Sequence, residues 1–150
     1  MKGAQVHKNR LARMRNIKSP IMRKLMEAGE IVRKDAADSI REGAVSGPGH
    51  VPSRPGEPPN ADTHNLDLGI DVRVSQSRLS VRVVSTAIYS AALEFGTSRI
   101  APRPFMRPAL QRNRNRLVLG MVQAANEVVR VYKSDEAAAR AAARYAERDS

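Results

Sequence analysis

The chain has 150 residues, of which 41% are hydrophobic, so we expect one domain with a core of aliphatic side chains and alanine. It has no cysteine, which excludes disulfides, thiolate metal sites and a cysteine nucleophile. Its net charge of +11 points to a polyanion or an acidic protein surface nearby, with solvated helix faces as the plainer alternative. No apolar run reaches the ~20 residues that cross a bilayer, and we expect a protein made and kept inside a cell, or inside something assembled there.

The N-terminal third predicts a basic arm followed by a long helix. Residues 1–18 are polar and basic, and fit either a short helix or an arm that a partner orders. Ser19 is suited to cap a helix, and Pro20 to be its first residue. Apolar residues then recur every three or four positions, which predicts a helix of about 24 residues that stops at Gly43.

Residues 44–66 form a stretch rich in proline and glycine, with five prolines between Pro48 and Pro59. Prolines at this density sustain neither a helix nor a central strand. Loops of some twenty residues are unusual inside a compact domain and often serve a function. We therefore predict an extended arm that reaches a partner.

The next segment changes from helical periodicity to strict alternation. Apolar and polar residues alternate from Leu68 to Val74 and again from Leu79 to Val83, which predicts an antiparallel hairpin with its turn at residues 75–78. Residues 86–95 are predicted to lead into a third strand through Leu93 and Phe95. The expected sheet is thus small and antiparallel.

A second long helix is predicted to open at Pro108 and to carry apolar residues along one side as far as Tyr132. Ser134 or Asp135 then caps or restarts an Ala-rich helix over residues 135–150. The resulting fold class is α+β: a long N-terminal helix, a small antiparallel β-sheet made of a hairpin and a third strand, a long C-terminal helix, and an extended Pro-rich loop.

Few residues in the sequence suggest catalysis. His7, His50 and His64 lack the spacing of metal ligands, and no phosphate-binding loop or nucleophile elbow is present. Asp67 and Asp71 are expected to face water. Glu94 could act as an acid or base, but it has no partner group nearby in sequence. We therefore expect no enzyme, no cofactor and no metal.

Residues 89–110 predict a rigid corner between the sheet and the closing helix. Gly96 permits a positive φ and a sharp bend, and Pro102 and Pro104 hold an extended connector. Phe95, Phe105 and Met106 are then fixed around this corner, where they either close the sheet onto the helix or form a binding surface.

The same segment resembles a family of bacteriophage morphogenesis proteins. The resemblance is carried by Tyr89, by the run from Leu93 through Glu94, Phe95 and Gly96 to Thr97, and by the run Pro104, Phe105, Met106, Arg107, Pro108, Ala109, Leu110. Members are small neck or tail-completion proteins of long-tailed phages. The Pro-rich arm and the Ala-rich C-terminal extension depart from the usual pattern of the family. We call the set of residues Tyr89, Leu93–Thr97, Pro102 and Pro104–Leu110 the signature.

The resemblance implies a structural virion protein rather than a catalyst. It implies a homo-oligomeric ring, with a hexamer expected from the tail's symmetry, at the neck of the virion and assembled in the host cytoplasm. The partners implied are head-completion or connector proteins and tail-terminator or tail-tube proteins, with contact to genomic DNA in the channel and no membrane. The alternative that the charge itself suggests is a small basic nucleic-acid-binding protein.

Overall fold

The computed structural model describes residues 2–42 and 44–148, without the side chains of residues 2–17, 142, 143 and 145–148. It confirms an α+β fold with long N-terminal and C-terminal helices and a two-stranded antiparallel sheet. The elements are α1 (Lys2–Arg41), α2 (Asn65–Leu68), β1 (Ile70–Ser75), β2 (Ser80–Ser85), α3 (Ser90–Phe95) and α4 (Met106–Arg148).

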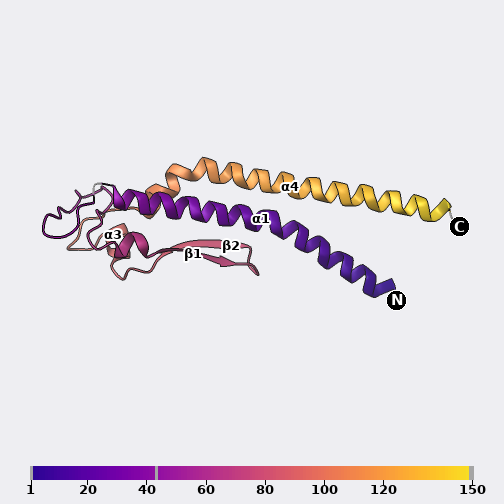
Figure 1. The fold of residues 1–150 in the computed structure, drawn as a ribbon, viewed down its shortest axis with the longest axis horizontal. Helices are drawn as coiled ribbons and strands as arrows, with labels where there is room; N and C mark the ends of the chain where they lie inside the picture. Colours follow the sequence, from indigo (N-terminus) through magenta and orange to yellow (C-terminus); the bar gives the residue numbers. More distant parts are fainter. Residues whose placement is uncertain (1, 43, 149–150) are drawn as a thin grey trace.

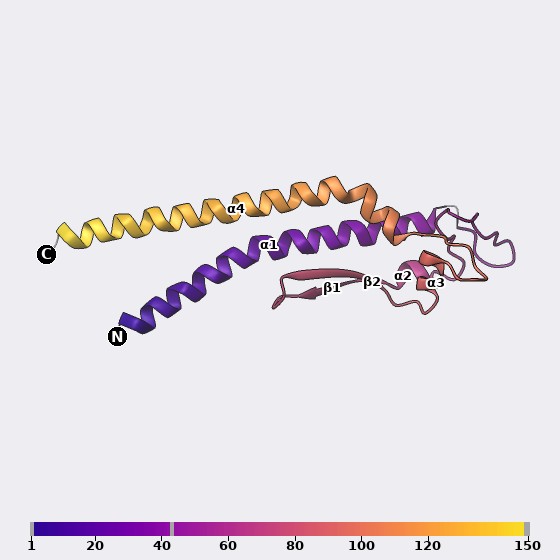
Figure 2. The same ribbon diagram turned by 180° about the vertical axis from the view of Figure 1, so that it is seen from behind.

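Helices α1 and α4 lie side by side and run in opposite directions, so that both chain termini lie at the same end of the molecule (Figure 1). The β1–β2 hairpin packs along α1. The short helices α2 and α3 and the long connections lie at the end of the molecule opposite to the chain termini (Figure 2). The helix α1 therefore contacts both α4 and the hairpin, and is the central element of the fold.

The predicted start of the first helix at Ser19 and Pro20 is wrong. Helix α1 begins at Lys2 and continues through Pro20, which is buried inside it, so residues 2–18 extend the helix. A proline inside a helix removes one hydrogen bond and bends the axis. Figure 1 shows α1 curving away from α4 toward its N-terminus. The predicted stop at Gly43 lies outside the described residues.

The predicted hairpin is confirmed, with strand ends shifted by one or two residues. Ile70 pairs with Ser85 and Val74 with Val81, which places the alternating apolar side chains of both strands on one face. That face packs on α1 at Gly29. A Cβ added at Gly29 would lie 2.7 Å from Val81 Cγ1 and 2.9 Å from Val72 Cγ1, so glycine lets the strands approach the helix closely.

Residues 44–64 contain turns but no helix or strand, and they are tied to the rest of the protein. The Ala61 amide donates to the Ile40 carbonyl at 2.9 Å, and the Gly56 amide donates to the Pro102 carbonyl at 2.9 Å. Arg103 Nε donates to the Ser53 carbonyl at 3.0 Å, and Ala61 itself is buried. The segment predicted as a reaching arm thus contributes to the core of its own chain.

The predicted third strand is wrong, because residues 90–95 form the short helix α3. The last helix begins at Met106, two residues before the predicted Pro108, and it runs without interruption past Ser134 and Asp135. None of the helices among the described residues is long and apolar enough to cross a membrane.

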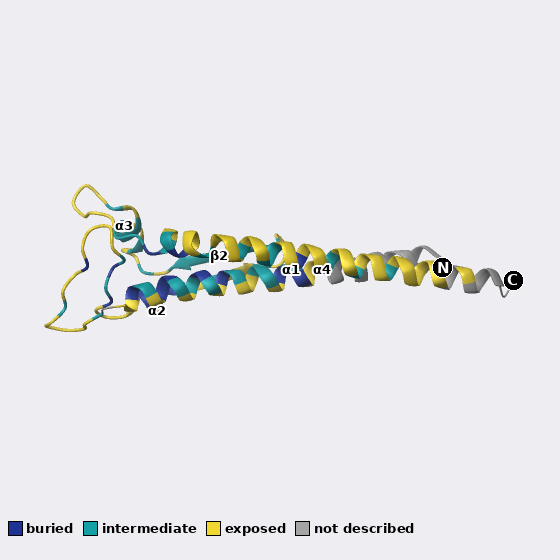
Figure 3. Ribbon diagram, turned by 90° about the horizontal axis from the view of Figure 1, so that it is seen from above, coloured by how far each residue is buried: buried dark blue, intermediate teal, exposed yellow. Residues whose placement is uncertain are grey.

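The buried core is small and lies near one end of the two long helices (Figure 3). Its largest members are Phe105, Ile40, Leu66 and Ile70, each at most 5% exposed. The whole chain exposes 11200 Å², whereas a compact monomer of 16.5 kDa exposes about 7,600 Å². The chain therefore leaves an unusually large surface uncovered.

Candidate functional site

The corner between α3 and α4 is built around the carboxylate of Glu94. Its Oε2 accepts from the backbone amides of Phe105 and Met106 at 2.9 and 3.0 Å, and its Oε1 accepts from the amide of Arg107 at 2.9 Å. These amides belong to the residue before α4 and to its first turn, where no intrahelical acceptor exists. A negative charge there also interacts favourably with the helix dipole. Glu94 therefore caps α4 from another helix, which explains why α4 begins at Met106.

The loop from Gly96 to Pro102 closes on itself. The Thr97 amide donates to the Ile100 carbonyl at 2.8 Å, and Thr97 Oγ1 accepts from the amides of Arg99 and Ile100. Gly96 has a φ of 75°, and a Cβ at this position would lie 3.0 Å from the Ile100 carbonyl oxygen. Positive φ and this close approach both require glycine. Gly96 and Thr97 therefore maintain the conformation of this loop.

The two phenylalanines of the signature have opposite environments. Phe105 is 1% exposed and belongs to the core, whereas Phe95 is 69% exposed. Phe95 therefore contributes little to the core, although Glu94 and Gly96 on either side of it are fixed by the corner and the loop. Of the two alternatives for this corner, Phe105 fits closure of the core, whereas the exposed Phe95 is the candidate contact residue.

Phe95 lies on the wall of an apolar groove of about 660 Å³. Its lining comes from α1, β2, α3 and the N-terminal part of α4, with Phe105 just before α4. Most of the lining side chains are aliphatic, which is typical of surfaces that bind an apolar partner. The principal lining residues are Leu25, Gly29, Val32, Val83, Phe95, Met106, Leu110 and Leu117.

The remaining signature residues divide between the core, the groove and the connector. Leu93 and Met106 pack against the core cluster, and Leu110, which is 52% exposed, lines the groove beside Arg107. The connector is held by the Arg103 amide, which donates to the Leu93 carbonyl at 2.6 Å between Pro102 and Pro104. Pro108 is half-buried in the first turn of α4, and Tyr89 precedes α3 on the other side of the corner.

The burial of the Asp67 carboxylate was not predicted, because the alternating pattern indicated that Asp67 faces water on a strand. Asp67 lies in α2, is 2% exposed, and accepts a hydrogen bond from Arg41 Nε of α1. The ring of His64 lies 3.4 Å from it. Burial alone would raise the pKa of Asp67, but the hydrogen bonds from Arg41 and His64 outweigh burial and lower it. The pair fastens α2 to the end of α1.

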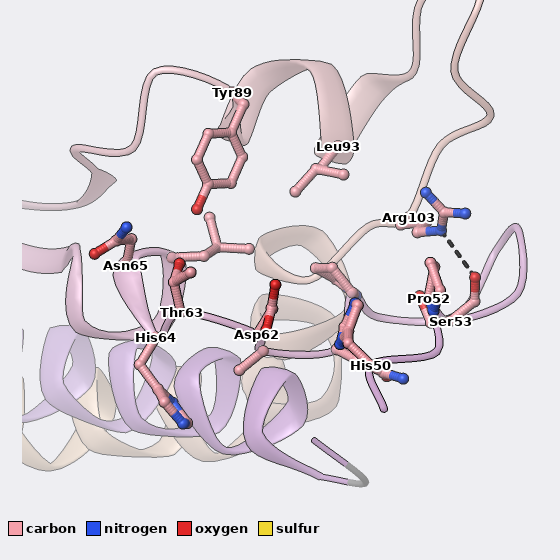
Figure 4. A pocket seen from close by; sticks show the side chains of 14 residues that line it. His50, Pro52, Ser53, Asp62, Thr63, His64, Asn65, Tyr89, Leu93 and Arg103 are labelled. Atoms are coloured by element: carbon pink, nitrogen blue, oxygen red, sulfur yellow. Dashed lines mark hydrogen bonds between the residues drawn. The ribbon is translucent and has the colours of Figure 1, made fainter. Parts of the chain in front are cut away.

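A second, polar pocket of about 320 Å³ lies between the Pro-rich connection and α3 (Figure 4). His50 Nδ1 is 3.0 Å from the Val45 carbonyl, and Asp62 accepts from the Gly47 amide. Both side chains are thus engaged with local backbone, and in Figure 4 the only drawn hydrogen bond joins Arg103 to Ser53. No hydrogen bond between these described side chains forms a nucleophile–base pair. Among the described residues no cluster suited to a metal ion occurs either.

Some of the basic residues in the described part of the chain are engaged in ion pairs between the two long helices. Arg112 is paired with Asp35 and Arg23 with Glu127, so several of them connect α1 to α4. On the outer face of the hairpin, Arg73 stands directly opposite Arg82, and both are exposed. Like charges at paired positions of a sheet are unfavourable unless something neutralises them.

The comparisons with known proteins found no matching family model, no similar curated protein and no similar solved structure.

Proposed function

We propose that this chain is a structural virion protein of the neck of a long-tailed bacteriophage, where it forms a ring that joins or completes the tail at the head–tail interface. In this proposal the ring is a homohexamer, and its neighbours are head-completion or connector proteins on one side and tail-terminator or tail-tube proteins on the other. The chain is not an enzyme, and its signature serves assembly.

The observation that carries the proposal is that the signature residues have two different roles. Glu94, Gly96, Thr97 and Phe105 build one rigid corner, and Phe95 stands exposed from that corner beside an apolar groove. Rigid presentation of an exposed aromatic side chain next to an apolar groove is typical of protein–protein interfaces.

The proposal is tested by removing the gene product from the phage that encodes it. We expect lysates of a nonsense mutant to contain filled heads and finished tails that remain separate in electron micrographs. Expression of the wild-type chain in trans should restore joined, infectious particles. Normal particles in the absence of the protein would refute the proposal.

A second candidate function is binding to nucleic acid, which the facing Arg73 and Arg82 side chains favour. A β-ribbon with paired arginines can contact the phosphates of a duplex, and such binding weakens steeply with salt. If DNA binding is the main function, replacing both arginines with glutamine should reduce the salt dependence by about two ions. A duplex that the wild-type chain fails to shift at 150 mM salt would exclude this candidate.

A further inference from the structure

A ten-residue segment of α4 carries no charge, although it lies on the protein surface. From Leu117 to Asn126 the sequence contains only aliphatic, glycine, glutamine and asparagine residues, and we call it the neutral segment. Val118, Leu119 and Val122 are each more than 50% exposed within it. A surface helix normally carries charged side chains on the face that meets water. The composition of this segment fits a helix that is covered on more than the side facing α1.

The exposed apolar residues of α4 follow a regular spacing. Val118, Val122, Ala125, Val129 and Tyr132 are separated by four, three, four and three positions, so they form one stripe along the helix. All five are exposed. Spacing of this kind is used by helices that place one apolar face into a groove of a partner.

The apolar groove is a suitable receptor for such a helix face. Residues of α1, β2, α3 and α4 line the groove, and the Phe95 and Leu110 side chains in its walls are largely exposed. Arg107 is the charged residue of α4 at the groove, and a helix without charge can approach it without like-charge repulsion or the burial of a second ion. None of the stripe residues of α4 is among the residues that line the groove, so the stripe of the same chain does not fill it.

We propose that the neutral segment of one copy, through its exposed residues Val118, Val122 and Ala125, occupies the apolar groove of the next copy. The contact joins two different surfaces, which is the heterologous type that closes a ring when repeated. It would cover part of the roughly 3,600 Å² by which the exposed area exceeds that of a compact monomer, and a standard interface needs about 800 Å² from each partner. The inference deepens the proposed function, since it names the surfaces that link ring subunits.

The test uses one acidic substitution in each surface. Phe95→Asp alters the groove and Val122→Asp alters the segment, and each should weaken self-association at least thirty-fold, measured as the concentration at which the assembled mass appears in sedimentation. Val51→Asp is the matched control, because Val51 is 72% exposed in the Pro-rich connection, away from both surfaces. The control should assemble like the wild type. Circular dichroism and thermal unfolding should show all three variants folded, since each side chain is at least half exposed.

Mixing the two defective variants gives the decisive result. One variant retains an intact groove and the other an intact segment, so an equimolar mixture should form a dimer that neither variant forms alone. Disruption by Val122→Asp with normal assembly of Phe95→Asp would indicate that α4 pairs with α4, and would overturn the proposal. A wild-type chain that stays monomeric at its highest soluble concentration would also overturn the proposal, because the groove and the neutral segment would then have to bind another protein.

These outcomes are separate from the test of the proposed function. Heads and tails that join without this protein would refute the neck assignment whatever its solution mass. A protein required for joining that keeps its wild-type mass with Phe95→Asp and Val122→Asp would retain the neck assignment and lose the proposed contact.

Discussion

The two ends of the α1–α4 pair are stabilised in different ways. At the end that carries the corner, a capping carboxylate, the ion pair between Arg41 and the buried carboxylate of Asp67, and the core cluster hold the elements together. In the middle of α4, the visible connection to α1 includes the Arg23–Glu127 pair, whose side chains are 63% and 41% exposed. Surface ion pairs typically contribute less than about 1 kcal/mol. The elements of the corner are therefore held together within one chain, whereas the distal part of α4 is joined to α1 more weakly and keeps exposed apolar side chains.

This difference separates residues that specify the fold from residues available for assembly. A substitution at the corner should lower the stability of the isolated protein, and a substitution on the exposed stripe should leave stability unchanged and alter association. Substitutions at the corner, and at Gly29 where the hairpin packs on α1, test this separation.

Glu94→Ala should have the largest effect on folding. It leaves the amides of Phe105, Met106 and Arg107 without their acceptor, and hydrogen bonds to a charged group contribute about 1.5–3 kcal/mol each without being additive. We expect the free energy of unfolding to fall by about 3 kcal/mol in urea titrations. Glu94→Gln should lose less, because it keeps one acceptor oxygen.

The control for this substitution is Glu57→Ala. Glu57 accepts a single bond from the Arg54 amide at 3.1 Å in an exposed turn, so its loss should cost less than about 1 kcal/mol. Equal effects at Glu57 and Glu94 would contradict the assignment of Glu94 as the cap of α4.

Asp67→Asn should cost about 2 kcal/mol at neutral pH, because the buried side chain loses its charge toward Arg41 and presents an amide donor to a donor. The folded pKa of Asp67 is lowered, so its contribution is complete above the unfolded pKa and is lost as the pH falls through the folded pKa. The difference in unfolding free energy between wild type and Asp67→Asn should therefore shrink in strong acid. Asp71→Asn, at an exposed strand position, should show little difference at any pH.

Much of the fold follows from local patterns in the sequence. Alternation predicted the hairpin, and helical periodicity predicted the two long helices, because both patterns depend on one buried face. The ends of the helices were misplaced for a physical reason. Pro20 and Pro108 are good first residues, but α1 continues through Pro20, and the start of α4 is decided by Glu94, which is distant in sequence.

The candidate site was predicted in position but not in the roles of its residues. The segment 89–110 does form the corner, yet Glu94 is a cap, and Phe95 and Phe105 lie in different environments. Such roles depend on which elements meet in three dimensions. The burial of Asp67 likewise requires Arg41 from another helix and had no local signal. The close approach of the hairpin at Gly29 likewise depends on which elements meet in three dimensions.

A pair of helical glycines gives the smallest and most specific test. Gly29→Ala places a Cβ within 3 Å of methyl groups of Val72 and Val81, whose branched side chains adjust poorly, so we expect a loss of about 1–2 kcal/mol despite the better helix propensity of alanine. Gly120→Ala adds the same methyl group to α4, where nothing lies within 4 Å, and should stabilise the isolated chain by up to about 1 kcal/mol. Thermal unfolding of the two variants should thus shift in opposite directions. If Gly29→Ala also raised the melting temperature, the hairpin would not pack on α1 as closely as described. If Gly120→Ala raised the stability of the monomer but weakened self-association, this result would indicate that a neighbouring copy packs against the neutral segment at Gly120, where the isolated chain has open space.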